Sequence, residues 1–251
     1  MAELCGWIEP NWPAPPGVRA LTTLRKGGYS QQPFDGLNLG DHVGDDPAAV
    51  MRNRQLLCQS TNLPSEPTWL TQVHGIDVIE ACVAPENWEA DALFSCTPGQ
   101  VCAVLTADCL PLLLCNRTGD RVAAVHAGWR GLADGVIEAT LDRLAVPGDE
   151  IMAWLGPAIG PECFEVGAEV RDTFLQHNPE TETAFRANRP DHWLADIYQL
   201  ARLRLKAYGV TAVWGGEYCT VTDKERFYSY RRDGRTGRMA TLIWIDLQVE
   251  D

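Results

Sequence analysis

The segment from Val101 to His126 constrains the fold more than any other part of the chain. It contains two apolar runs, 101–106 and 112–115, followed by a third strand-like run at 121–126. The sequence between the last two, Asn-Arg-Thr-Gly-Asp at 116–120, is typical of a turn, so these runs predict a β-hairpin. Hairpin-joined strands next to helix-joined strands favour an α+β fold with a mixed sheet over a strictly alternating doubly wound fold.

The rest of the chain alternates predicted helices and strands. Asp46 followed by Pro47 is a good helix start, with Asp46 as N-cap, and the helix should run to about Ser60. Further helices are predicted at 132–144, from Glu165 to about Gln176, and from a cap at Asp191 to Gly209, and further strands at 76–82, 151–155, 210–214 and 242–247. Because we find no repeat and no linker, we predict one domain over residues 1–251.

Composition excludes several classes of function. The formal net charge is −13, which repels nucleic acid, although a local arginine cluster can still bind a small anion. The nine cysteines form no CxxC pair, which argues against a disulfide framework and a zinc ribbon. Residues 1–10 do not resemble a signal peptide, and no apolar run is long enough to span a membrane. We therefore expect a cytoplasmic protein with a small-molecule partner.

Three short segments each place one potential metal ligand beside small or turn-forming residues: His74 in TQVHG, Cys109 in TADCLP and His126 in HAGWRG. Two imidazoles and one thiol suit a soft dication such as zinc, with one position left open for water or substrate. Taken singly, each residue has an ordinary alternative, a core thiol or a hydrogen-bonded loop histidine. Only together do they indicate a site.

Residues next to these ligands add candidate roles. Asp108 stands in an otherwise apolar stretch and needs a partner, so it could orient a histidine or take a proton in catalysis. Arg130 follows the strand that ends at His126 and precedes a helix, where it and the loop amides could hold phosphate or carboxylate. His42 lies in a loop that could line a pocket.

Read in order, these segments resemble one family. The segments are those at 38–40, 42–45, 72–75, 90–92, 106–109, 126–131, 156–160 and 229–233, and together they span most of residues 20–247. They are similar to the YfiH-like, laccase-domain family, whose members are also called polyphenol oxidase or peptidoglycan editing factor and are in many cases described as purine nucleoside phosphorylases. The resemblance implies a single α+β domain, related in fold to deamidating-toxin cysteine hydrolases, with zinc held by His74, Cys109 and His126.

The same resemblance implies phosphorolysis of adenosine, inosine, guanosine and methylthioadenosine, together with adenosine deamination. It leaves open copper-dependent phenol oxidation. The five histidines are too few for a multicopper oxidase, but a single copper could occupy the same ligands. In nucleobase deaminases the histidine ligand begins an HxE motif whose glutamate carries the proton. Neither histidine ligand begins such a motif here, so Asp108 and Asp91 are the candidate proton shuttles for deamination.

A third possibility is a metal-free Cys–His hydrolase or amidase acting on a cell-wall precursor, with Cys109 as nucleophile and His126 as base. The extra histidine, His74, favours a metal instead. On this basis we assign catalysis to His74, Cys109, His126, Asp108 and Arg130. Substrate binding is assigned to Asn38, His42, Asp91 and Arg231.

Overall fold

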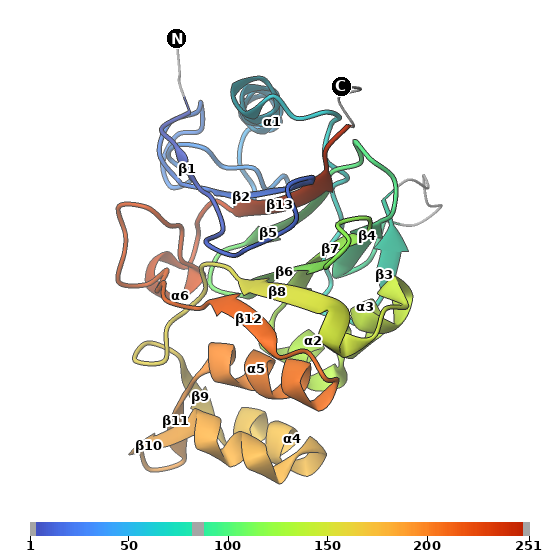
Figure 1. Ribbon diagram of the computed structural model, residues 1–251. Coiled ribbons are helices and arrows are strands. Elements are labelled where there is room, and N and C mark those ends of the chain that lie inside the picture. The colour runs from blue at the N-terminus through green and yellow to red at the C-terminus, as the bar shows by residue number, and fades with distance from the viewer. Residues whose placement is uncertain (1–3, 82–87, 248–251) are drawn as a thin grey trace.

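The computed structural model describes residues 4–81 and 88–247, and its elements are labelled in Figure 1. The helices are α1 (Pro47–Thr61), α2 (Trp129–Asp134), α3 (Val136–Leu144), α4 (Ala168–His177), α5 (Ile197–Ala207) and α6 (Tyr230–Asp233). The strands are β1 (Trp7–Ile8), β2 (Val18–Thr23), β3 (Val78–Glu80), β4 (Ala92–Ser95), β5 (Cys102–Thr106), β6 (Leu110–Asn116), β7 (Val122–Ala127), β8 (Ile151–Leu155), β9 (Glu165–Gly167), β10 (Phe185–Arg189), β11 (His192–Ala195), β12 (Ala212–Gly215) and β13 (Met239–Ile245).

These elements form stacked layers (Figure 1). Helix α1 covers a four-stranded antiparallel sheet of order β1-β2-β13-β5, which lies on a six-stranded sheet of order β12-β8-β6-β7-β4-β3. The larger sheet is mixed, because β12–β8 and β3–β4 are parallel and its other pairs are antiparallel. Helices α2, α3 and α5 cover its other face, with α4 and the small sheet β10-β11-β9 beyond them. The predicted α+β class and mixed sheet are confirmed.

Strand β6 shows why the sequence of a central strand is almost continuously apolar. Leu112 and Leu114 face the helix layer, whereas Leu113 and Cys115 face the four-stranded sheet, and all four are fully buried. A strand that is covered on both faces has no solvent side, so it lacks the usual alternation of apolar and polar residues. The predicted hairpin to β7 is confirmed, with Leu112 opposite Val125.

Other predicted elements are confirmed with small shifts. Helix α1 begins at Pro47, and the Asp46 side chain caps it by accepting from the Ala48 N–H. The strand predicted at 151–155 is β8, and those at 210–214 and 242–247 are β12 and β13 with shifted bounds. Of the strand predicted at 76–82, Val78–Glu80 forms β3, and residue 82 lies outside the described residues. The sequence does not predict strands β1, β2, β4 and β10.

Three predicted helices are wrong in extent. The one at 132–144 is two helices, since Gly135 with φ +105° breaks it, and α2 begins earlier at Trp129. The one from Glu165 starts as strand β9. The one from Asp191 starts as strand β11, and Asp196 caps the shorter α5. In the last two cases pairing between β9 and β11, distant in sequence, overrides the local helical spacing.

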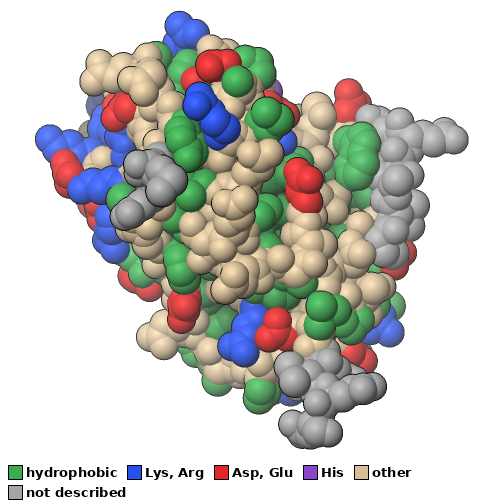
Figure 2. Space-filling model, turned by 90° about the horizontal axis from the view of Figure 1, so that it is seen from above, with side chains coloured by type: hydrophobic (Ala, Val, Ile, Leu, Met, Phe, Trp, Pro, Cys, Tyr) green, Lys and Arg blue, Asp and Glu red, His purple; other side chains and the backbone are tan. Residues whose placement is uncertain are grey.

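The face that carries α1 mixes acidic and basic side chains (Figure 2). The negative net charge is therefore not gathered into one uniform patch on this face. Within residues 4–81 and 88–247, no helix has the length and apolar character required to cross a membrane.

The corrected start of α5 gives a direct test. The Asp196 carboxylate accepts from the N–H groups of Tyr198 and Gln199, both at 3.0 Å. We expect Asp196→Ala to lower the free energy of unfolding by about 1 kcal/mol, measured by urea denaturation, because it leaves these donors without their cap. The matched control is Asp191→Asn, which keeps a side chain tolerant of the left-handed φ of +60° and should change stability by less than about 0.5 kcal/mol. If Asp191→Asn lowered the free energy of unfolding more than Asp196→Ala, Asp191 would be the helix cap instead.

Candidate metal and active site

The structure brings His74, Cys109 and His126 together from three separate chain segments. His74 lies in the loop before β3, Cys109 in the turn between β5 and β6, and His126 near the end of β7. Cys109 Sγ is 3.8 Å from His74 Nε2, and the two imidazole rings meet edge to face at 4.8 Å between centroids. One ligand atom from each residue lies within 4.8 Å of the others.

The loop conformation that presents His74 depends on Asp91. His74 has φ +61°, a left-handed conformation that is unfavourable for a residue with a Cβ. The buried Asp91 carboxylate accepts from the N–H groups of Val73, His74 and Gly75, at 3.2, 2.9 and 2.6 Å. These hydrogen bonds hold the loop against the start of β4.

Asp91 also orients His126. Its Oδ1 lies 2.7 Å from His126 Nδ1, so the other ring nitrogen, Nε2, is the one left for Cys109 or a metal. Asp91 is fully buried and does not line the cavity described below, so its assignment as a substrate contact is wrong. It is a positioning residue. Burial raises the pKa of Asp91, but the hydrogen bond and charge of His126 and the loop N–H groups outweigh this and lower it.

Asp108 is held in place by other partners. Its φ is +93°, and its carboxylate accepts from Thr220 Oγ1 at 2.5 Å, Ser229 Oγ at 3.1 Å and the Arg231 N–H at 2.6 Å. The predicted partner of a buried aspartate is therefore present. These partners of Asp108 are two hydroxyl groups and a backbone N–H. The residue that orients a histidine is Asp91, which contacts His126. Asp108 instead anchors α6 beside Cys109.

The site favours a thiolate next to an imidazolium. Burial raises the pKa of Cys109, but the charge and hydrogen bond of His126, together with His74, outweigh it and lower the pKa below that of an ordinary thiol. For His126 burial lowers the pKa, but Cys109 and Asp91 outweigh it and raise the pKa. When a soft dication replaces the proton on His126, the Cys109 thiolate and two imidazole nitrogens form the donor set that such a cation binds.

The geometry also fits a single metal ion. Tetrahedral zinc at ordinary bond lengths separates its sulfur and nitrogen ligands by about 3.5 Å, close to the 3.8 Å between Cys109 and His74. Gly128 leaves the necessary space, because a Cβ there would lie 2.7 Å from His74 Cδ2 and 3.3 Å from Cys109 Sγ. These three residues could therefore hold a metal while leaving one position open.

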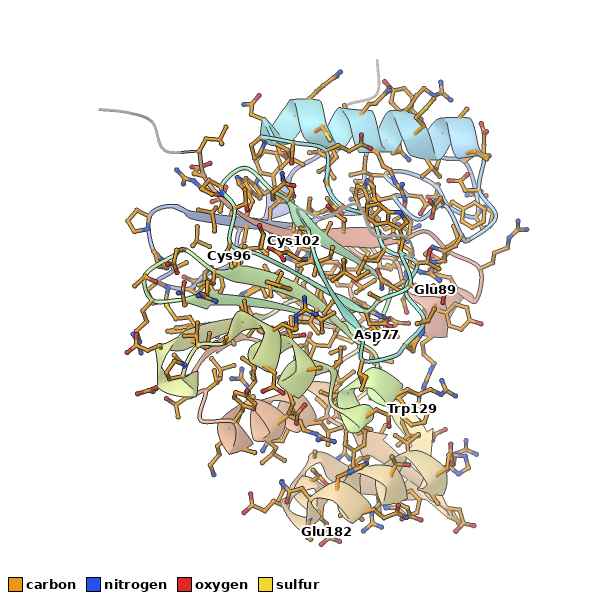
Figure 3. All side chains as sticks on the ribbon, turned by 90° about the vertical axis from the view of Figure 1, so that its right-hand side faces the viewer. Asp77, Glu89, Cys96, Cys102, Trp129 and Glu182 are labelled. Atoms are coloured by element: carbon orange, nitrogen blue, oxygen red, sulfur yellow. The ribbon has the colours of Figure 1, made fainter. Side chains whose placement is uncertain are left out.

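The three ligands lie in a cavity of about 410 Å³, a size that suits a small metabolite. Its apolar lining includes Leu105, Ile159, Phe164 and Trp129. Trp129 stands at the start of α2, between the six-stranded sheet and α4 (Figure 3). The polar lining includes Thr106, whose buried Oγ1 has no hydrogen-bond partner in the described part of the chain.

Positive charge surrounds this cavity. Arg130, Arg231 and Arg238 line it, and His42 lies beside them. Arg231 donates to the carbonyls of Cys163 and Glu165, and Arg238 donates to those of Thr236 and Gly237. Among the described residues, none of these three arginines has a carboxylate within 4.0 Å.

Of the other predicted substrate contacts, His42 and Arg231 line the cavity and Asn38 does not. Asn38 is fully buried: its amide donates to Gly40 O and Asp45 Oδ2, and its Oδ1 accepts from the Arg238 N–H at 2.9 Å. The assignment of Asn38 as a substrate contact is therefore wrong. It supports the backbone of Arg238, which sequence reasoning left without a role. Arg238 is the last arginine of the dense basic segment 231–238, and this clustering is the sequence feature that could have indicated its place at the cavity.

An α+β fold with a His–Cys–His cluster in an arginine-lined cavity defines a class of small-molecule enzyme. The chain belongs to the YfiH-like, laccase-domain family: the family model described as multi-copper polyphenol oxidoreductase laccase matches residues 19–246. A purine nucleoside phosphorylase of Pseudomonas aeruginosa is 58% identical over 240 residues, covering 95% of this chain and 98% of the relative. Escherichia coli purine nucleoside phosphorylase YfiH is 54% identical over 239 residues, with the same two coverages.

Solved structures agree with this placement. A Neisseria meningitidis protein has a TM-score of 0.93 at 50% identity, covering 96% of this chain and 99% of that chain. YlmD from Geobacillus stearothermophilus has a TM-score of 0.89 at 32% identity, covering 98% of both chains. These relatives support an enzyme of the purine nucleoside phosphorylase kind.

Gly128 provides a test of the metal ligands. In Gly128→Ala the new Cβ must displace the His74 ring, although the φ of −64° accepts alanine without strain. We expect metal affinity to fall about 10- to 100-fold while the melting temperature changes little, measured by metal titration of the metal-free protein and by calorimetry. The control is Gly17→Ala, whose Cβ would meet nothing within 4 Å. If Gly128→Ala binds metal as the parent does, His74 is not a ligand.

Proposed function

We propose that this protein is a zinc-dependent purine nucleoside phosphorylase that accepts adenosine, inosine, guanosine and methylthioadenosine and also deaminates adenosine. The observation that carries the proposal is the position of the His74, Cys109 and His126 cluster in a cavity lined by three arginines without carboxylate partners among the described residues. The names of the relatives from Pseudomonas aeruginosa and Escherichia coli support the same class.

The arginines point to an anionic ligand. The chain carries an excess of 13 negative charges, yet Arg130, Arg231 and Arg238 have no ion pair within the described residues. An arginine with free N–H groups matches the oxygens of phosphate, often in a bidentate arrangement. In phosphorolysis, phosphate attacks the anomeric carbon of the nucleoside and the bond to the purine breaks. The arginines would hold that phosphate and offset its charge.

The remaining lining suits the nucleoside. Leu105, Ile159, Phe164 and Trp129 offer an apolar wall against which a purine can pack and which keeps water from the reacting carbon. The Thr106 hydroxyl, which has no hydrogen-bond partner among the described residues, can bond to a sugar hydroxyl or a ring nitrogen. A zinc ion on His74, Cys109 and His126 would supply a Lewis acid at the floor of the cavity.

Deamination requires a proton carrier, for which Asp91 and Asp108 are the candidates. Asp91 is enclosed beneath the ligands, whereas Asp108 lines the cavity. Asp108 also has the Ser229 and Thr220 hydroxyls on its two oxygens, through which a proton can pass. We therefore propose Asp108 as the carrier.

One observation favours a second candidate, the Cys–His hydrolase acting on an amide of a cell-wall precursor. Asp91 Oδ1 lies 2.7 Å from His126 Nδ1, and His126 lies in one cluster with Cys109, the same order of residues as in a catalytic triad. His74 argues for the metal, since a triad does not use a second imidazole at the sulfur. A further alternative keeps the metal site but places copper instead of zinc on the same three ligands, which would make the protein a phenol oxidase.

Metal content and turnover separate these functions. We expect the purified protein to hold zinc on this one site and to release adenine from adenosine only when phosphate is present. Cys109→Ala should lose the metal and at least about 100-fold in kcat/KM, since metal catalysis is worth several kcal/mol. Cys96→Ala, at an exposed cysteine outside the cavity, is the control and should resemble the parent.

Other outcomes would replace the proposal. A metal-free protein without nucleoside turnover, in which Cys109 is rapidly alkylated, would support the hydrolase. Copper with phenol oxidation would support the oxidase. Ammonia release from adenosine without phosphate, lost in Asp108→Asn, tests the deaminase part separately.

The arginines predict a specific kinetic signature. Arg231→Gln and Arg130→Gln should raise KM for phosphate about 10- to 100-fold, the value of one charge-assisted hydrogen bond, and change KM for inosine much less. Initial rates over a grid of both substrates give the two constants. Arg186→Gln is the control. Arg186 is an exposed residue of β10 in the small sheet, and it forms an ion pair with Glu162 at 2.6 Å. Equal rises in both constants would contradict a phosphate role.

A further inference from the structure

Gln72, which lines the cavity, uses both polar atoms of its side chain on the backbone of strand β5. Its Nε2 donates to Leu105 O at 2.8 Å, and its Oε1 accepts from the Leu105 N–H at 2.7 Å. Such an exchange of an N–H and a carbonyl is the way in which two residues pair in an antiparallel sheet. The side-chain amide of Gln72 therefore takes the place of a paired residue at the end of β5.

This pairing fills a gap at the edge of the four-stranded sheet. Strand β5 is the last strand of that sheet and pairs with β13 on one side. On its other side Thr68 bridges to the start of β5, but Thr71 already bridges to the segment before β4. Leu105 is 3% exposed, so its N–H and carbonyl would be buried without these partners if Gln72 did not bind them.

The position of Gln72 in the chain connects this pairing to the metal ligands. Gln72 stands two residues before His74, and Leu105 stands four residues before Cys109. Asp91 ties the loop of His74 to the six-stranded sheet, whereas Gln72 ties the same loop to β5 in the four-stranded sheet above it (Figure 1). Cys109 lies in the turn that joins the two sheets. The loop is thus attached to both of the layers from which the cluster is built.

We propose that Gln72 is a positioning residue that sets the placement of His74 relative to Cys109 and thereby the affinity of the cluster for its metal. The inference rests on the metal centre of the proposed function and adds a residue that acts on this centre through the backbone. Removal of the Gln72 amide would free one side of the loop while Asp91 still held the other side. The 3.8 Å between His74 Nε2 and Cys109 Sγ would then change.

A direct contact of Gln72 with substrate is the competing role. Such a contact requires polar atoms that are available to the ligand, and both polar atoms of this amide are already bonded to Leu105. A substrate contact would alter the binding of nucleoside and leave the metal unaffected. A positioning role alters the metal even when no substrate is present, so metal binding separates the two.

The test measures cobalt binding by the metal-free protein. Cobalt takes the place of zinc on such ligands, and its visible absorption bands report the number and arrangement of the ligands. We expect Gln72→Met, which keeps the length of the side chain without its polar atoms, to raise the dissociation constant about 10- to 100-fold and to change the spectrum. Gln72→Asn keeps the amide but is shorter by one carbon–carbon bond. The loop must then move or lose its hydrogen bonds, so this spectrum should change as well.

Thr22→Val is the matched control. It removes a buried hydrogen bond of 2.9 Å between the Thr22 and Thr241 hydroxyls, in the same four-stranded sheet but outside the cavity lining. It should lower the melting temperature while the cobalt affinity and spectrum stay those of the parent. A merely structural role of Gln72 would give this same result in both Gln72 variants.

The proposal is overturned if both Gln72 variants bind cobalt with the affinity and spectrum of the parent, or if Thr22→Val shifts them equally. If Gln72→Met does not fold, Gln72→Asn decides alone. A parent protein that binds no cobalt would overturn the metal centre itself and this proposal with it. Failure of the metal centre therefore shows in the parent, and failure of the positioning role shows only in the variants.

Discussion

The hydrogen bonds of the buried Asp91 carboxylate are the interaction on which the site depends. A carboxylate without solvent contact must be surrounded by donors, and Asp91 receives three from the loop that carries His74 and one from the His126 ring. Its own carbonyl also accepts from the His126 N–H at 2.7 Å. One charged group thus fixes the left-handed backbone at His74 and the ring orientation of His126. Since the two histidines come from segments about 50 positions apart, this network is what converts three separate loops into one cluster.

The layered fold gives this network a rigid base. Strands β5, β6 and β7 are buried along their whole length, so the ends at which Cys109 and His126 lie have little freedom to move. The turn between β5 and β6 is constrained further, because Asp108 accepts three hydrogen bonds from residues more than 100 positions later in the chain. Catalytic groups held in this way are preorganised, which lowers the reorganisation required during the reaction.

The sequence was informative where chemistry is local and uninformative where it depends on distant partners. The Asp46 cap and the hairpin from β6 to β7 follow from adjacent residues, and the three ligands were recognisable from their short motifs. The role of Asp91 was not, because its partners are separated from it by a strand on one side and by 35 positions on the other. For the same reason helical spacing misassigned 192–195, whose pairing with β9 no local pattern reveals.

The choice between metal enzyme and Cys–His hydrolase turns on residues that both chemistries share. Asp91 would orient His126 equally well as a zinc ligand or as a general base, so the Asp–His–Cys series does not discriminate. The residues outside that series do. His74 is held in an unfavourable backbone conformation to bring a second nitrogen to 3.8 Å from the Cys109 sulfur, which a hydrolase does not require. The arginines of the cavity point the same way, since they have no carboxylate partner within residues 4–81 and 88–247, and such a guanidinium suits a phosphate better than a neutral amide. Both features support the proposed metal centre acting on an anionic co-substrate over the hydrolase.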